Sequence, residues 1–239
     1  MGVSPIPKKT CNYSCIYCQL GRTDRMTNER RMFYPVQEIL DELDEFLESR
    51  VPFDVVTIVG EGEPTLYLGL GELIDGIRRK TDKAIAVITN GALLYDRQLQ
   101  EEICRADIVL PTVDAWDEAT FRRINRPHGS LRYEEVTRGL EEFSQSYQGQ
   151  IWIELMLMKG INDDNGSLAE YAKIIRRIRH EKVYLNTPVR PPAEAGVEPV
   201  DHDRMEQAAA LLGGIPIDLL ESGDFHSEVT DDYEALLGI

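Results

Sequence analysis

The stretch that decides this sequence is Cys11-Asn12-Tyr13-Ser14-Cys15-Ile16-Tyr17-Cys18. Thiolates at this spacing can each ligate one iron of a cubane iron–sulfur cluster and leave its fourth iron without a protein ligand. A simple electron carrier would supply a further cysteine to close that iron, and none follows at a suitable spacing. A structural zinc ion is the alternative, with His128 as a distant fourth ligand.

The remaining cysteine is set apart from this loop. Cys104 lies alone in an apolar helical pattern beside Ile103 and Ala106. A free cysteine in such surroundings usually behaves as a small buried hydrophobic side chain. We therefore expect Cys104 to be buried and to ligate nothing.

The chain is acidic overall and basic around the cysteines. Its 239 residues carry 26 Lys and Arg against 42 Asp and Glu, a formal net charge of −16. This charge disfavours a broad grip on nucleic acid without excluding a single RNA base as substrate. Residues 1–31 reverse the balance, with six basic side chains against two acidic ones. No apolar run approaches the ~20 residues of a membrane span, and residues 1–10 lack the apolar core that a signal peptide would have. We therefore expect a cytoplasmic protein without a membrane partner.

Short apolar runs alternate with amphipathic segments along most of the chain. We predict strands at 55–59, 84–88, 108–113, 151–158, 183–185 and 215–220. We predict helices at 36–48, 70–80, 96–106, 131–147, 166–179 and 202–213, with Asp96 and Asp201 as N-caps. Buried strands that alternate with helices predict an α/β fold, either a barrel or a doubly wound parallel sheet. We expect one domain at 1–221 and an acidic tail at 222–239, in which residues 233–237 form a short covering helix.

Polar residues follow the predicted strands at their carboxyl ends, where ligands of parallel α/β folds gather. The first long strand leads into the turn Gly60-Glu61-Gly62-Glu63-Pro64, where glycine allows close backbone approach. Asn90 ends the next strand before Gly91, as a ligand contact or as an ordinary turn residue. Asp114 ends the following strand, as a hydroxyl acceptor or as the cap of a helix that begins near Asp117.

One predicted strand carries a charged residue in its middle. Alternation places Glu154 on the opposite face from Ile153 and Leu155. Because a buried charge is costly, we expect Glu154 to point into a barrel interior, with a structural pair to an arginine as the alternative. Asn186 and Arg190, which follow the next strand, are candidate substrate contacts, as are Arg126 and His128 in an earlier loop.

Together these features resemble the radical S-adenosylmethionine (SAM) superfamily. Its signature has this cysteine spacing with an aromatic residue before the last cysteine, here Tyr17, and Gly62-Glu63-Pro64 resembles its Gly-Gly-Glu-Pro motif, with Glu61 at the first glycine position. The resemblance implies a partial (β/α)6 barrel of mainly parallel strands. It also implies a [4Fe–4S] cluster on Cys11, Cys15 and Cys18, whose open iron binds SAM. The SAM-binding residues that it implies are Tyr17, Gly62, Glu63, Pro64, Asn90, Asp114 and Glu154.

The superfamily's chemistry defines the function that the resemblance implies. In its members a reduced cluster cleaves SAM, and the resulting 5′-deoxyadenosyl radical removes a hydrogen atom from a substrate, which is unidentified here. Flavodoxin or ferredoxin is the implied electron donor, and we expect Lys8, Lys9, Arg22 and Arg25 to dock its acidic surface. The alternatives are an activase that installs a radical on a partner protein and a non-enzymatic metal-binding module.

Five stretches look closest to a group of short prokaryotic proteins related to the tRNA-wyosine synthases. They are residues 5–22, 59–66, 88–91, 124–128 and 185–192. The synthases carry additional N-terminal cysteines for a second cluster, and Cys11 opens the only cluster motif here. The substrate therefore stays open.

Overall fold

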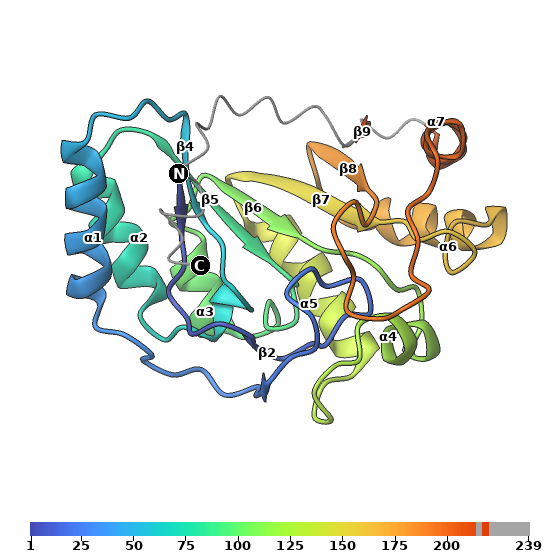
Figure 1. Ribbon diagram of the computed structural model, residues 1–239, viewed down its shortest axis with the longest axis horizontal. Helices are drawn as coiled ribbons and strands as arrows, with labels where there is room; N and C mark the ends of the chain where they lie inside the picture. Colours follow the sequence, from blue (N-terminus) through green and yellow to red (C-terminus); the bar gives the residue numbers. More distant parts are fainter. Residues whose placement is uncertain (214–216, 220–239) are drawn as a thin grey trace.

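The apolar runs pair into one parallel sheet (Figure 1). The computed structural model describes residues 1–213 and 217–219. Within those ranges seven strands pair in the order β1-β4-β5-β6-β7-β8-β9, each parallel to its neighbours. Their bounds are β1 Gly2–Val3, β4 Val55–Ile58, β5 Ala84–Thr89, β6 Ile108–Pro111, β7 Gln150–Met156, β8 Lys182–Asn186 and β9 Ile217–Leu219. A separate parallel pair joins β2 (Thr10–Cys11) to β3 (Arg25–Met26).

Each connection from β4 onward contains a helix. The bounds are α1 Val36–Glu48, α2 Leu70–Lys80, α3 Arg97–Ile103, α4 Glu118–Ile124, α5 Tyr133–Ser146, α6 Asn165–Ile175 and α7 His202–Leu212, with a 3₁₀ turn, η1, at Pro64–Leu66. Strands that follow one another in the chain are neighbours in the sheet, whereas a doubly wound sheet reverses direction partway. The predicted partial (β/α)6 barrel is confirmed.

The helices begin and pack as their sequences predict. The Asp96 carboxylate accepts a hydrogen bond from the Gln98 backbone N–H at 2.8 Å and caps α3, and Asp201 caps α7 through the Arg204 N–H at 3.0 Å. Helix α1 buries one apolar stripe at Val36, Ile39, Leu40 and Leu43. In Figure 1 α1 and α2 lie at one end of the sheet, and α6 and α7 lie at the other.

The alternation in β7 separates the core from the barrel interior. Ile151, Ile153 and Leu155 are fully buried, while Trp152 and Glu154 keep partial exposure on the other face. This face encloses the lumen, so the expectation that Glu154 points inward is met. The strand ends at Met156, two residues before the predicted bound of 158.

The expectation for Cys104 is wrong. Cys104 is exposed at the C-cap of α3, and its thiol lies 3.1 Å from the Glu101 carbonyl oxygen. The buried residues of α3 are Leu99 and Ile103. One further residue turns the helix by about 100°, which carries Cys104 away from the core.

Some expectations fall beyond the residues that the structure describes. The acidic tail at 222–239, with its helix at 233–237, and the end of the 1–221 domain lie there. Among residues 1–213 and 217–219, no helix combines the length and apolar character that crossing a membrane requires.

Candidate cofactor site and barrel lumen

The cysteine loop is held against the carboxyl ends of the strands by backbone hydrogen bonds. Cys11 ends β2, and the Ser14 and Ile16 N–H groups donate to the carbonyl oxygens of Asn125 (2.9 Å) and Ile124 (3.0 Å) at the end of α4. Figure 1 shows the β2 segment at the end of the sheet toward which the strand arrows point. The loop therefore packs on the fold at both its start and its middle.

All three loop cysteines line one cavity of about 230 Å³, together with Gly62 and Glu63. Burial raises the pKa of Cys11 to about 12, and it also raises the pKa values of Cys15 and Cys18. Thiols in such surroundings stay protonated unless a cation compensates the charge of the thiolate. Coordination to a metal provides this compensation and deprotonates the thiol. The donor set and its burial thus fit an iron–sulfur cluster, which would supply the positive charge that the cavity needs.

Glu63 is the centre of a buried hydrogen-bond network. Its side chain is only 2% exposed. It accepts from the Thr65 N–H (3.0 Å), the Thr89 hydroxyl (2.6 Å) and the Asn90 N–H (2.7 Å). The carboxylate thus ties η1 to the end of β5 and serves the fold directly, rather than presenting free oxygens to a ligand.

Gly62 permits a close backbone approach, as the sequence predicts. A Cβ atom at this position would lie 1.9 Å from the Thr10 carbonyl oxygen, and the Glu63 N–H donates to that oxygen at 3.0 Å. Since Thr10 precedes Cys11, any side chain at position 62 would displace the start of the cysteine loop.

Asn90 occupies a turn and also reaches the cysteine loop. Its Oδ1 accepts from the Ala92 N–H at 2.9 Å, and Gly91 adopts φ +74°. Its Nδ2 donates to Asn12 Oδ1 at 2.7 Å and to Cys11 Sγ at 3.7 Å. The turn interpretation holds, and the structure adds a sulfur contact.

Asp114 joins the cysteine loop to β7. The Tyr17 hydroxyl donates to its carboxylate, as do Asn125 Nδ2 at 3.2 Å and the Met156 N–H at 3.0 Å. Burial raises its pKa to about 7, although these donors favour the ionised form. The alternative that Asp114 caps the next helix is wrong, because Asp117 caps α4 through the Thr120 N–H at 2.7 Å.

A larger cavity of about 660 Å³ fills the barrel lumen. It shares a wall with the cysteine cavity, formed by Tyr17, Cys18, Gln19, Ile88 and Glu154. Asn186 Nδ2 donates to Glu154 Oε1 at 2.9 Å, and the Thr112 hydroxyl lies 3.4 Å from Glu154 Oε2. Amide and hydroxyl groups thus hold Glu154, and the alternative of an arginine partner is wrong.

The profile of the Radical SAM superfamily matches residues 6–184. The chain belongs to this superfamily. Its members use a [4Fe–4S] cluster and SAM and are typically enzymes, and one structural neighbour was solved with AdoMet bound. The chemistry of the loop cysteines agrees with this membership.

Curated relatives include proteins that are longer than this radical SAM chain. A UPF0026 protein of Methanocaldococcus jannaschii is 36% identical over 217 residues, covering 90% of this chain and 67% of the relative. A UPF0026 protein of Synechocystis is 35% identical over 192 residues, covering 80% and 71%. A protein named GTPase Obg from Brachyspira hyodysenteriae is 37% identical over 208 residues, but these span 87% of this chain and only 31% of the relative. The chain groups with the UPF0026 proteins.

Solved structures share the fold. TYW1 with a lysine-pyruvate adduct bound has a TM-score of 0.66 and 20% identity, covering 87% of this chain and 71% of that one. A radical SAM methyltransferase from Sphaerobacter thermophilus has a TM-score of 0.70 and 17% identity, covering 93% and 66%. At these identities the likeness concerns the fold, which is related to that of the wyosine synthase.

The remaining candidates are the predicted substrate contacts, of which two line the lumen of the radical SAM barrel and two do not. Asn186 and Arg190 line the lumen, with Arg190 Nη1 2.7 Å from Gln19 Oε1. Arg126 forms an ion pair with Glu194 at 2.5 Å, and His128 Nδ1 lies 2.8 Å from the Ser130 hydroxyl. Neither Arg126 nor His128 lines the lumen, and both fasten surface loops.

Sequence reasoning missed Asn125. It is 3% exposed, and its Nδ2 donates to Cys15 Sγ at 3.6 Å as well as to Asp114. In the sequence it is one polar residue in the Asn-Arg-Pro-His loop, and no spacing links it to Cys15. Only the C-terminus of α4 brings the two together.

Proposed function

We propose that this chain holds a [4Fe–4S] cluster on Cys11, Cys15 and Cys18 and uses SAM for radical chemistry on a substrate in the lumen. One observation carries the proposal: the cysteines line a cavity that shares a wall with a larger, mostly apolar chamber. In the described part of the chain, no three His, Cys, Asp or Glu side chains converge as ligands of one metal ion would. Sulfurs spread around a cavity favour a cluster, in which each cysteine binds a different iron, over zinc.

The chain's own groups provide a cradle for SAM. When bound, the cluster and SAM supply the electron transfer and hydrogen abstraction that characterise the superfamily. The carbonyl oxygens of Gly60 and Gly62, at the rim of the cavity, accept no hydrogen bond within the described residues. We assign them as acceptors for the SAM ammonium group, while Glu63 and Pro64 hold their turn in place.

The wall between the cysteine cavity and the lumen is where we expect the SAM nucleoside to contact the substrate. Tyr17 and Glu154 face both cavities, and Glu154 keeps its carboxylate among neutral donors. We assign these two residues to the SAM nucleoside. Asn90 lines the cysteine cavity and Asp114 does not; we assign both to holding the cysteine loop, Asn90 through Asn12 and Asp114 through Tyr17.

The lumen is assigned to the substrate. Its walls include Trp152, Tyr184 and Met156, with Asn186 and Arg190 among its polar groups. Its mostly apolar walls limit the water around a reactive radical. A chamber of about 660 Å³ has the volume of a small-molecule site, so we favour a free metabolite or a single base over a partner protein, and the activase is the second alternative.

Reduction requires an outside electron donor, for which we propose a flavodoxin or ferredoxin. Internal partners already occupy most of the basic residues near the cluster: Lys8 pairs with Glu61 at 3.4 Å and Lys9 with Asp24 at 3.7 Å. Arg25 is exposed and lies in β3, directly beside β2 and Cys11. We therefore assign Arg25 the larger share of any electrostatic docking.

Anaerobic reconstitution with iron, sulfide and dithionite tests the proposal. We expect four irons and four sulfides per chain, and formation of 5′-deoxyadenosine and methionine from SAM. Cys15→Ser should lose both the iron and the cleavage, whereas the matched variant Cys104→Ser should keep both, because Cys104 is exposed at the end of α3. Zinc in place of iron, or a cluster that does not cleave SAM, would contradict the proposal.

A further inference from the structure

Two of the loop cysteines each accept a hydrogen bond from the side-chain amide of an asparagine. Asn90 Nδ2 lies 3.7 Å from Cys11 Sγ, and Asn125 Nδ2 lies 3.6 Å from Cys15 Sγ. Sulfur is a larger acceptor than oxygen, so both separations are those of N–H···S hydrogen bonds. In the part of the chain that the structure describes, no side-chain donor reaches Cys18.

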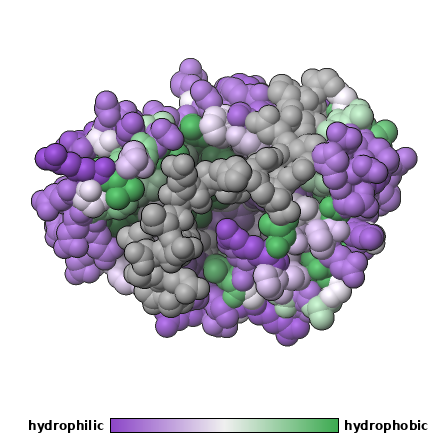
Figure 2. Space-filling view, turned by 45° about the horizontal axis from the view of Figure 1, so that its top comes forward, coloured by the Kyte–Doolittle hydropathy of each residue, from purple (hydrophilic) through white to green (hydrophobic). Residues whose placement is uncertain are grey.

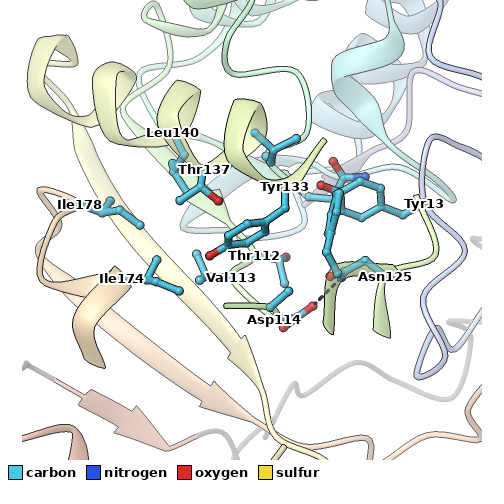
Figure 3. Close-up of a pocket in the computed structure, with 15 residues that line it drawn as sticks. Tyr13, Thr112, Val113, Asp114, Asn125, Tyr133, Thr137, Leu140, Ile174 and Ile178 are labelled. Carbon is cyan, nitrogen blue, oxygen red and sulfur yellow. Dashed lines mark hydrogen bonds between the residues drawn. The ribbon is translucent and has the colours of Figure 1, made fainter. Parts of the chain in front are cut away.

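Neighbouring groups fix the orientation of both amides. Asn90 Oδ1 accepts from the Ala92 N–H at 2.9 Å, and its Nδ2 also donates to Asn12 Oδ1 at 2.7 Å. Asn125 Nδ2 donates to Asp114 Oδ2 at 3.2 Å, the dashed contact in Figure 3. Each amide nitrogen carries two hydrogens and has one oxygen and one sulfur as acceptors, so its donor side faces the cysteine.

Both asparagines are tied to a buried carboxylate. The Asn90 N–H donates to Glu63 Oε2 at 2.7 Å, and Asn125 contacts Asp114. Each carboxylate is thus linked to a cysteine through one asparagine, by the backbone N–H of Asn90 in Glu63–Asn90–Cys11 and by the side-chain amide of Asn125 in Asp114–Asn125–Cys15. The two asparagines come from different elements, because Asn90 follows strand β5 and Asn125 follows helix α4.

We propose that Asn90 and Asn125 are positioning residues that donate to the cluster thiolates and raise the cluster's reduction potential. This inference rests on the function proposed above. Adding an electron makes the cluster more negative, and hydrogen bonds to its sulfur ligands stabilise that charge. The buried carboxylates of Glu63 and Asp114 oppose it. Glu63 accepts from the backbone N–H of Asn90, and Asp114 accepts from the side-chain nitrogen of Asn125 that also donates to Cys15.

Redox titration of the reconstituted protein, followed by electron paramagnetic resonance, tests the proposal. Asn125→Leu and Asn90→Leu keep the side-chain size and remove the donor, so each should make the midpoint potential more negative. The double variant should shift it further than either single one. Asn162→Leu is the matched control, since Asn162 is also buried and donates to the Met156 carbonyl and the Tyr171 hydroxyl, and its potential should equal that of the wild type.

A measurement on the wild-type protein tests the same proposal even if the variants fail to assemble a cluster. Asparagine labelled with ¹⁵N in its amide should give electron spin-echo modulation from nitrogens close to the reduced cluster. Unlabelled asparagine in an otherwise ¹⁵N-labelled protein should give the reciprocal pattern. Absence of both signals, or variant potentials equal to that of Asn162→Leu, would overturn the inference.

The inference and the proposed function fail in different ways. If the wild type assembles no four-iron cluster or does not cleave SAM, the proposed function falls and takes the inference with it. If the wild type cleaves SAM and the Asn90→Leu and Asn125→Leu variants have its midpoint potential, the inference alone is wrong.

Discussion

The two adjoining cavities are built on different principles. Around the cysteines, Glu63, Asn90 and Asp114 are held by hydrogen bonds from the protein itself, so the shape is set before any ligand arrives. The lumen is almost three times larger and is walled by side chains such as Trp152 and Tyr184. Figure 2 shows one face of the molecule, where hydrophilic residues predominate and hydrophobic residues form small groups. A fixed cavity beside a roomier chamber agrees with the proposed division between a cofactor site and a substrate site.

The largest expected effect comes from filling the cradle. Gly62→Ala would place a methyl group 1.9 Å from the Thr10 carbonyl oxygen. The backbone before Cys11 must move, so we expect the free energy of unfolding to fall by roughly 2–4 kcal/mol and the iron content to drop. Urea unfolding of the cluster-free protein and iron analysis measure the two effects.

The control for this variant is Gly129→Ala. No heavy atom lies within 4 Å of a Cβ atom at position 129, so stability should change by less than about 1 kcal/mol. Equal iron content and stability in Gly62→Ala and Gly129→Ala would remove the argument for a preformed cradle.

The next effect concerns pH. Burial raises the pKa of Asp114 from 3.8 to about 7, so between these values the folded state holds a proton that the unfolded state has lost. Its contribution to stability is complete below about pH 4 and is lost as the pH rises toward 7, by up to about 1.4 kcal/mol per pH unit. In the cluster-free protein, Asp114→Asn should therefore gain stability relative to the wild type as the pH rises over this interval.

Asp117→Asn is the control for the pH experiment. Hydrogen bonds from Thr120 lower the pKa of Asp117, so its carboxylate is ionised in both states above about pH 5. The stability difference from the wild type should then be flat between pH 5 and 8. A flat difference for Asp114→Asn as well would show that burial does not hold its proton.

A smaller effect is expected on the lumen side. Trp152 lines the lumen and not the cysteine cavity, and Lys182 Nζ lies 4.4 Å from its ring centroid. Trp152→Leu should cost about 1 kcal/mol of stability and leave substrate-free SAM cleavage within about twofold of wild type, or about 0.4 kcal/mol. Tyr17→Leu, on the shared wall, should reduce cleavage more strongly. Equal losses of SAM cleavage in Trp152→Leu and Tyr17→Leu would mean that SAM cleavage depends on both cavities.

The smallest effect is expected at the surface. Arg25→Glu should slow reduction by flavodoxin a few-fold at low salt, and the difference should vanish at high salt because exposed charges are screened. Arg138→Glu makes the same charge change at an exposed position of α5, outside the basic segment 1–31, and this variant should be reduced at the wild-type rate. Identical kinetics in the two variants would exclude docking at Arg25.

The sequence predicted features that depend on local spacing. Short patterns predict the cysteine loop, the Gly62 turn, the helix caps at Asp96 and Asp201 and the parallel direction of the strands, and the structure has them. The Asp114–Asn125–Cys15 contacts join residues up to 110 positions apart, so no periodicity reveals them. Glu154 was expected inside the barrel, but its Asn186 partner lies on the next strand and depends on the register of β7 with β8.

In the proposed site, three cysteines leave one iron open for SAM. Electron–nuclear double resonance on the reduced protein, with ¹⁵N in the amino group of SAM, tests it most directly. We predict a hyperfine coupling as strong as that of a nitrogen bonded to iron, present in the wild type and in Cys104→Ser. Bound SAM without such a coupling would mean that the fourth iron is closed or absent, and would contradict the account.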